Sequence, residues 1–169
     1  MKSVNLLKIY TLIHVVISLL GILSGFLVIY GMLNADPMNA WTEFFLWTTV
    51  LTSVTGFGFP FQRLLPSHVI GLLSLAILAV ALYAMYGRRL GGAWKRVYMT
   101  CAMLALYFNV FVLVVQSFMK VPALHALAPT QSEAPFAIAQ LAVLVIFVTI
   151  GILVLRSTRW PAAAANAHG

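Results

Sequence analysis

Two histidines are the residues of this sequence best suited to chemistry in an apolar environment. His14 lies about six residues into the first apolar run, roughly 9 Å by helix rise, and His68 stands just before the third run. An ionisable residue inside a membrane segment is a functional candidate, and two axial histidines can hold a haem. The alternative for His14 is a neutral imidazole that hydrogen-bonds to a neighbouring helix.

Neutral polar side chains form a second candidate site. Asn109 and Gln116 lie two helical turns apart and therefore share one face of a helix. With the threonines of the second apolar run, such amides can line a seam for a small ligand or for water. The predicted seam comprises Thr48, Thr52, Thr55, Asn109, Gln116 and Gln140. The alternative is plain hydrogen bonding between helices, worth about 0.6 kcal/mol per bond.

No catalytic motif accompanies these residues. The sequence contains no Gly-rich phosphate loop, no Gly-x-Ser-x-Gly and no His-Glu-x-x-His. Cys101 is the single cysteine, which excludes a multi-cysteine metal or iron–sulfur site. We therefore favour a non-enzymatic role, leave an enzymatic one open, and predict no metal site. No cofactor is predicted, and haem b is the one that the two histidines would allow.

The composition places these residues in a membrane protein. Of the 169 residues, 63% are hydrophobic and only 8% are charged, whereas a soluble domain carries about 25% charged residues. Lys and Arg total 10 against 3 acids, for a formal net charge of +7. Because the basic residues lie between apolar runs, they indicate lipid contact and membrane topology rather than nucleic acid.

Five apolar segments divide the chain into the elements that must position the candidate residues. We expect an all-α integral membrane helical bundle that forms a single domain over residues 1–160, followed by a disordered tail over residues 161–169. The segments are residues 9–33, 43–61, 69–86, 97–118 and 137–155.

Residues 48–68 decide how many of these segments cross the membrane. Threonine hydroxyls and the run Gly56-Phe57-Gly58-Phe59-Pro60 suit a chain reversal. If the segment returns to the outer side, every basic residue except Arg63 and Lys120 falls inside, as the positive-inside rule asks. We therefore expect four full transmembrane helices plus a re-entrant or broken second segment, with both termini cytoplasmic.

Five transmembrane helices are the alternative, and the choice bears on the haem hypothesis. With four crossings, His14 and His68 lie near opposite faces of the membrane, too far apart to share one iron. With five crossings they fall on the same side. The number of crossings therefore also tests whether the two histidines can act together.

Two further patterns predict partners. The motif Gly21-x-x-x-Gly25 allows close helix contact, either within the bundle or at the seam of a homo-oligomer or of a membrane partner. The basic residues of the loop at residues 87–96 serve either as a positive-inside signal alone or as contacts to anionic lipid. They are Arg88, Arg89, Lys95 and Arg96.

Several runs of this sequence carry a resemblance. They are residues 48–61, 65–68, 107–116, 120–124, 127–133 and 135–136. In these runs the chain resembles a group of small bacterial integral membrane proteins of unknown function. The resemblance implies a bacterial cytoplasmic (inner) membrane, and it brings no activity, cofactor or assigned site.

Three functions fit these observations. The favoured one is a non-enzymatic membrane module that packs with itself or with a partner and holds a small ligand in the Thr/Asn/Gln seam. The first alternative is a haem-binding or redox membrane protein that uses His14 and His68. The second alternative is a channel or carrier for a small solute.

Overall fold

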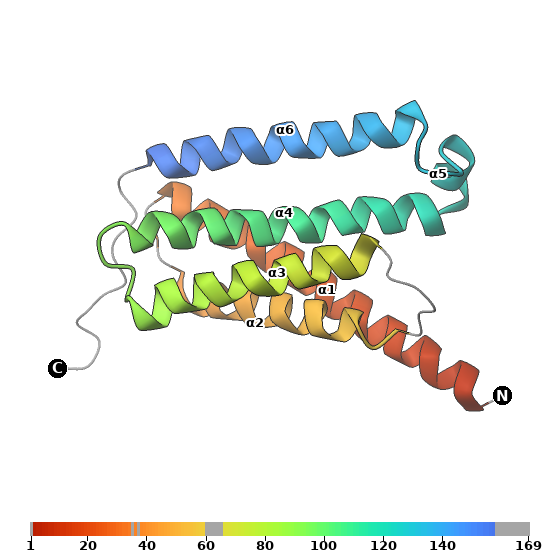
Figure 1. Cartoon of the computed structure of the whole chain (residues 1–169), viewed down its shortest axis with the longest axis horizontal. Coiled ribbons are helices and arrows are strands. Elements are labelled where there is room, and N and C mark those ends of the chain that lie inside the picture. Colours follow the sequence, from red (N-terminus) through yellow and green to blue (C-terminus); the bar gives the residue numbers. More distant parts are fainter. Residues whose placement is uncertain (1, 35, 37, 60–65, 158–169) are drawn as a thin grey trace.

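Long helices make up nearly all of the described chain in the computed structural model (Figure 1). The structure describes residues 2–34, 36, 38–59 and 66–157. The elements are α1 (Lys2–Asn34), α2 (Asn39–Gly56), α3 (Pro66–Leu82) with its π-helical continuation η1 (Tyr83–Gly87), α4 (Trp94–Lys120), α5 (Pro122–Leu127) and α6 (Ala134–Arg156). The predicted all-α bundle is confirmed. The tail at residues 161–169 lies outside the described residues.

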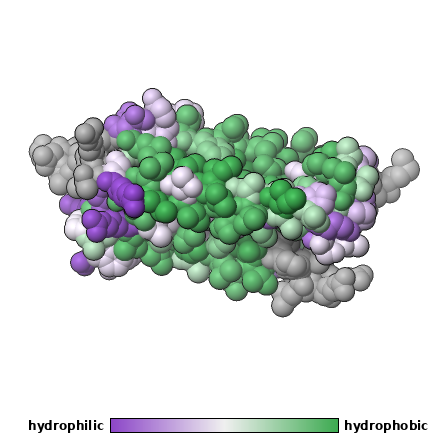
Figure 2. Space-filling model, turned by 90° about the horizontal axis from the view of Figure 1, so that it is seen from above, coloured by the Kyte–Doolittle hydropathy of each residue, from purple (hydrophilic) through white to green (hydrophobic). Residues whose placement is uncertain are grey.

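Four stretches are long and apolar enough to cross a membrane, as the sequence predicts. Their outer surfaces are covered by large apolar side chains, and Figure 2 shows an apolar band between two hydrophilic ends. Such a surface suits lipid, so the chain is a multi-pass membrane protein. The stretches are Asn5–Asn34, His68–Gly87, Trp94–Lys120 and Ala134–Arg156.

The second segment is an unbroken helix up to Gly56, and the chain reverses only after that residue. Two of its threonine hydroxyls donate to carbonyls of the same helix, Thr48 Oγ1 to Phe44 O and Thr55 Oγ1 to Leu51 O, each at 2.6 Å, which preserves the helix instead of interrupting it. α2 runs antiparallel to α1 (Figure 1). The expected turn begins at Phe57, and Pro60 lies outside the described residues.

Among the described residues, α2 buries more polar side chains than any of the four spanning stretches, while its Glu43 stays exposed. Its buried residues include Thr42, Thr48, Thr49 and Ser53. A helix on the surface of a soluble protein shows the opposite distribution, with polar residues outside. Although α2 is not among the four spanning stretches, its outward face therefore suits hydrocarbon. That face carries Trp41, Phe44, Trp47, Leu51 and Val54.

The five long helices alternate in direction, so α1 begins and α6 ends at opposite ends of the bundle (Figure 1). The end where α6 finishes, called here the basic end, carries Arg88, Arg89, Lys95, Arg96 and Arg156. The opposite end holds His14 and His68, and also the basic residues Lys8 and Lys120. Arg63 and Arg159, which enter the charge argument, lie outside the described residues.

The core gathers around α4 with buried residues from α1, α2, α3 and α6, and the glycine motif of α1 lies within it. A Cβ at Gly25 would lie 2.6 Å from Leu106 Cδ1 and 2.9 Å from Phe45 Cε2. A Cβ at Gly21 would lie 3.3 Å from Thr48 Oγ1. Both glycines therefore allow close packing within the bundle, and this face of α1 is not open to a second copy.

Candidate functional site

His14 is tied to the end of α2 by a hydrogen bond that fixes its tautomer. Its Nδ1 lies 2.8 Å from Thr55 Oγ1. The Thr55 hydroxyl already donates to Leu51 O at 2.6 Å, so it accepts from His14 and Nδ1 carries the proton. In a neutral imidazole this leaves Nε2 with its lone pair, able to accept a hydrogen bond or to bind a metal.

Tyr10, one turn before His14, strengthens the same contact. Its hydroxyl donates to the backbone carbonyl of Thr55 at 2.6 Å. A Cβ at Gly58 would collide with that hydroxyl, so the close approach requires glycine there. Sequence reasoning missed Tyr10, although its spacing from His14 places both residues on one face of α1.

The turn at residues 57–59 places both histidines at the same end of the bundle. The Phe59 ring packs edge-on against His14, with centroids 5.1 Å apart. The Phe57 ring lies 5.7 Å from that of His68, which is buried at the start of α3. Each imidazole thus contacts a phenylalanine of one short turn. Both histidines at one end is the placement expected if five helices cross the membrane.

The residues of the predicted seam lie in separate places. Asn109 Nδ2 donates to Thr49 Oγ1 at 3.4 Å, a long bond between two buried side chains of α4 and α2. Gln140 Nε2 donates to Phe111 O at 3.2 Å, at the contact between α6 and α4. Thr49 is the partner that sequence reasoning missed, because only the packing of α2 on α4 identifies it.

The other residues of the predicted seam take no part in these two hydrogen bonds. Thr48 bonds within its own helix and Thr55 bonds to His14. Thr52 Oγ1 is buried without a hydrogen-bond partner among the described residues, and Gln116 is half-buried on α4. Ligand binding by the seam as a whole therefore stays a prediction.

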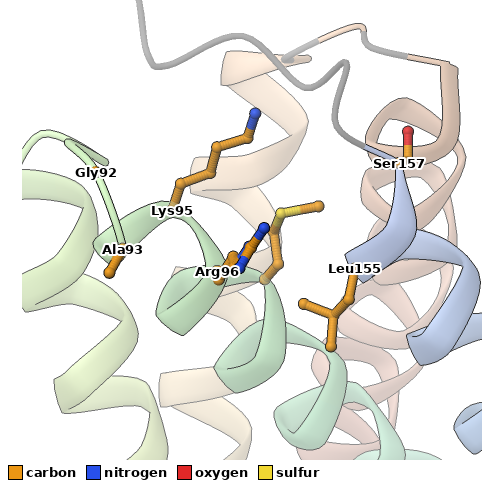
Figure 3. A pocket seen from close by; sticks show the side chains of 7 residues that line it. Gly92, Ala93, Lys95, Arg96, Leu155 and Ser157 are labelled. Carbon is orange, nitrogen blue, oxygen red and sulfur yellow. The ribbon is translucent and has the colours of Figure 1, made fainter.

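A pocket of about 440 Å³ opens at the basic end (Figure 3). It lies between the loop before α4, the first turns of α4 and the end of α6. We call it the basic pocket. Its lining residues are Gly92, Ala93, Lys95, Arg96, Met99, Leu155 and Ser157.

The basic pocket combines uncompensated positive charge with an apolar floor. Lys95 and Arg96 have no carboxylate partner in the described structure, which includes Asp36, Glu43 and Glu133, the only three acids of the chain. α4 begins here without a side-chain cap, so its positive dipole end adds to the field. Met99, which is 2% exposed, forms part of the floor.

The four basic residues expected to contact anionic lipid divide into two pairs. Lys95 and Arg96 line the pocket. Arg88 instead stacks over the Trp94 ring, 5.3 Å from its centroid, and Arg89 is exposed in a left-handed backbone conformation with φ of 47°. A specific anion site at this end would therefore use Lys95 and Arg96.

No protein-family model, curated protein or solved structure matches the chain. The resemblance to small bacterial membrane proteins thus stays an expectation. The functional argument rests on the histidine contacts at one end of the bundle and the basic pocket at the other.

Proposed function

We propose that the protein is a non-enzymatic module of a bacterial cytoplasmic membrane that binds an anionic, phosphate-bearing ligand in the basic pocket. The observation that carries this proposal is the pair Lys95 and Arg96, which line a pocket of about 440 Å³ and lack a carboxylate partner. Phosphate oxygens accept charge-assisted hydrogen bonds from ammonium and guanidinium groups. In the predicted seam, by contrast, most of the polar groups already bond to the protein itself.

In this proposal α2 crosses the membrane as a fifth helix. Its 18 residues extend about 27 Å by helix rise, close to the hydrocarbon thickness of about 30 Å. Its apolar outward face supports the same placement. By the positive-inside rule the basic end faces the cytoplasm, so α1 begins on the outer side. This arrangement replaces the expectation that both termini are cytoplasmic.

Binding of phosphatidylglycerol by the purified protein in detergent, followed by native mass spectrometry, tests the proposal. Lys95→Gln with Arg96→Gln should weaken binding by about tenfold or more, since each basic residue contributes about 1 kcal/mol. The matched control is Arg88→Gln with Arg89→Gln, which removes the same charge outside the pocket and should bind nearly as well as the unmodified protein. Equal losses of lipid binding in the two double variants would contradict a defined site.

A haem-binding or redox role is the second candidate, because His14 and His68 lie at the same end of the bundle. The Nδ1–H of His14 is held by Thr55, as in many metal-ligating histidines, which leaves Nε2 for iron. The rings of Phe57 and Phe59 lie against the two imidazoles, so a haem b between them would have to displace these rings. When bound, the haem would supply electron transfer.

The absorption spectrum of protein expressed with ample haem tests this second candidate. A Soret band that disappears in both His14→Ala and His68→Ala would establish it. A spectrum without that band would remove it, and would leave the basic-pocket proposal unaffected.

A channel or carrier for a small solute is the remaining alternative. It requires water between α2 and α4, where Thr49 and Asn109 pair in a buried position. Cysteines placed at positions 109 and 116 test it, because a water-soluble thiol reagent would modify both only in a wet pathway.

A further inference from the structure

An apolar groove between α4 and α6 adjoins the basic pocket. Its volume is about 250 Å³, and Leu155 lines both hollows. On α4 the lining continues directly from Met99 in the pocket to Thr100 and Met103 in the groove. The groove is lined by Thr100, Met103, Leu104, Tyr107, Leu144, Phe147, Val148, Gly151, Ile152 and Leu155.

The groove has the length of one lipid leaflet. From Leu155 to Leu144 along α6, the helix rise gives about 16 Å. Half of the hydrocarbon core of a bilayer is about 15 Å. The groove therefore extends from the basic end to about the middle of the membrane, which is the depth that one acyl chain reaches from its headgroup.

The groove is open to lipid, and Gly151 leaves free space in its lining. Leu104, Leu144 and Val148, all in its lining, are exposed on the outer surface of the bundle. A Cβ at Gly151 would find only Met103 Cε within 4 Å, at 4.0 Å. The missing side chain therefore leaves room that no other described residue fills.

We propose that one intact anionic phospholipid occupies both hollows, with its phosphate in the basic pocket and one acyl chain in the groove. The inference rests on the proposed function and deepens it, because it names the ligand as a lipid of the leaflet at the basic end rather than a soluble phosphate compound. Charge complementarity selects the headgroup at Lys95 and Arg96. The acyl chain gains close packing against the protein and no transfer out of water, since hydrocarbon surrounds it both in the groove and in the bilayer.

Phosphatidylglycerols of long and short acyl chain, bound to the purified protein in detergent, test the inference. The unmodified protein should bind the dioleoyl form about tenfold more tightly than the dihexanoyl form. Gly151→Leu, which fills the groove, should reduce that preference to about twofold or less while Lys95 and Arg96 still select the anionic headgroup. Val148→Phe provides a second obstruction from the groove rim.

The matched control is Leu153→Phe, which adds bulk to α6 at an exposed position outside the groove and should keep the chain-length preference. Retained preference in both groove variants would overturn the inference, as would equal binding of both lipids to the unmodified protein. Competition by free glycerol phosphate at the same concentration as the lipid would point to a soluble ligand and also overturn it. If the inference fails in any of these ways, the proposed function still stands as long as the double variant of Lys95 and Arg96 loses binding and the double variant of Arg88 and Arg89 keeps it.

Discussion

Thr55 joins α1 and α2 through two separate atoms. Its hydroxyl accepts from His14 and its carbonyl accepts from Tyr10. The hydroxyl proton is used within α2 itself, so Thr55 partners three polar groups, two through its hydroxyl and one through its backbone carbonyl. Because lipid offers no replacement partner, these bonds fix the register of the two helices.

Replacing Thr55 by Val should lower the free energy of unfolding in mixed detergent micelles by about 0.6–1.7 kcal/mol, from the average to the maximum for a hydrogen bond between membrane helices. Thr149→Val is the matched control, because Thr149 bonds only within α6, to Val145 O at 2.8 Å. Thr55→Ser should keep most of the stability. Equal losses for Thr55→Val and Thr149→Val would show that the contact to His14 contributes nothing.

At the scale of the element, the packing of α1 against α2 and α4 depends on Gly25. Gly25→Ala places a Cβ against Leu106 and Phe45, and such overpacking costs about 1–3 kcal/mol. The melting temperature in detergent should fall. Gly151→Ala, where a Cβ has room, should leave it nearly unchanged, and adding Leu106→Val to Gly25→Ala should restore part of the loss.

The start of α6 carries a carboxylate whose charge the fold stabilises. Desolvation is the largest single influence and raises the pKa of Glu133, but hydrogen bonds from Thr130, its own backbone and Ser132 together outweigh it, and the pKa ends below its ordinary value of 4.5. Thr130 Oγ1 donates to Oε1 at 2.9 Å and Ser132 N donates to Oε2 at 3.1 Å. The charged form therefore favours the folded loop.

Because the pKa is lowered on folding, this stabilisation is complete above about pH 4.5. It is lost as the pH falls through the folded pKa. Unfolding of the unmodified protein and of Glu133→Gln, measured between pH 3 and 7, should differ near neutrality and converge in acid. A difference that persists at the lowest pH would mean that Glu133 acts by packing and not by charge.

At the scale of the whole molecule, hydropathy alone predicted the four spanning helices but not which face of α2 turns toward the core. Hydropathy averages over all faces of a helix, whereas α2 sends Thr49 and Ser53 inward and Trp47 outward. Which face turns inward depends on neighbours that are distant in sequence. His14 and Thr55 were both candidates, but their pairing depends on the antiparallel register.

The pocket was foreseen only in part, for a similar reason. Lys95 and Arg96 were expected to contact anionic lipid, yet the pocket also requires Leu155 and Ser157 from the end of α6. Nothing in the local sequence links these residues to the loop before α4. The packing of α6 on α4 creates both the pocket and the groove beside it.

Reporter fusions at Met1 and at Gly169 test the topology. With five crossings the two ends should report opposite sides, and Gly169 should be cytoplasmic. A reporter inserted between Arg89 and Gly92 should share the side of Gly169, because both would lie at the basic end. Cytoplasmic signals from both termini would restore four crossings and place α2 on the outer side.

The reversed polarity of α2 also determines how the chain can be assembled during synthesis. Alone in hydrocarbon, α2 would present the side chains of Thr49 and Ser53 to lipid. α1 covers part of that side, because its glycine face lies against Thr48 and Phe45, whereas Thr49 pairs with Asn109 of α4. We therefore expect α1 and α2 to leave the translocation machinery together as a helical hairpin, with α4 completing their packing afterwards. A ribosome that stalled before Gly56 would leave α1 inserted without its partner.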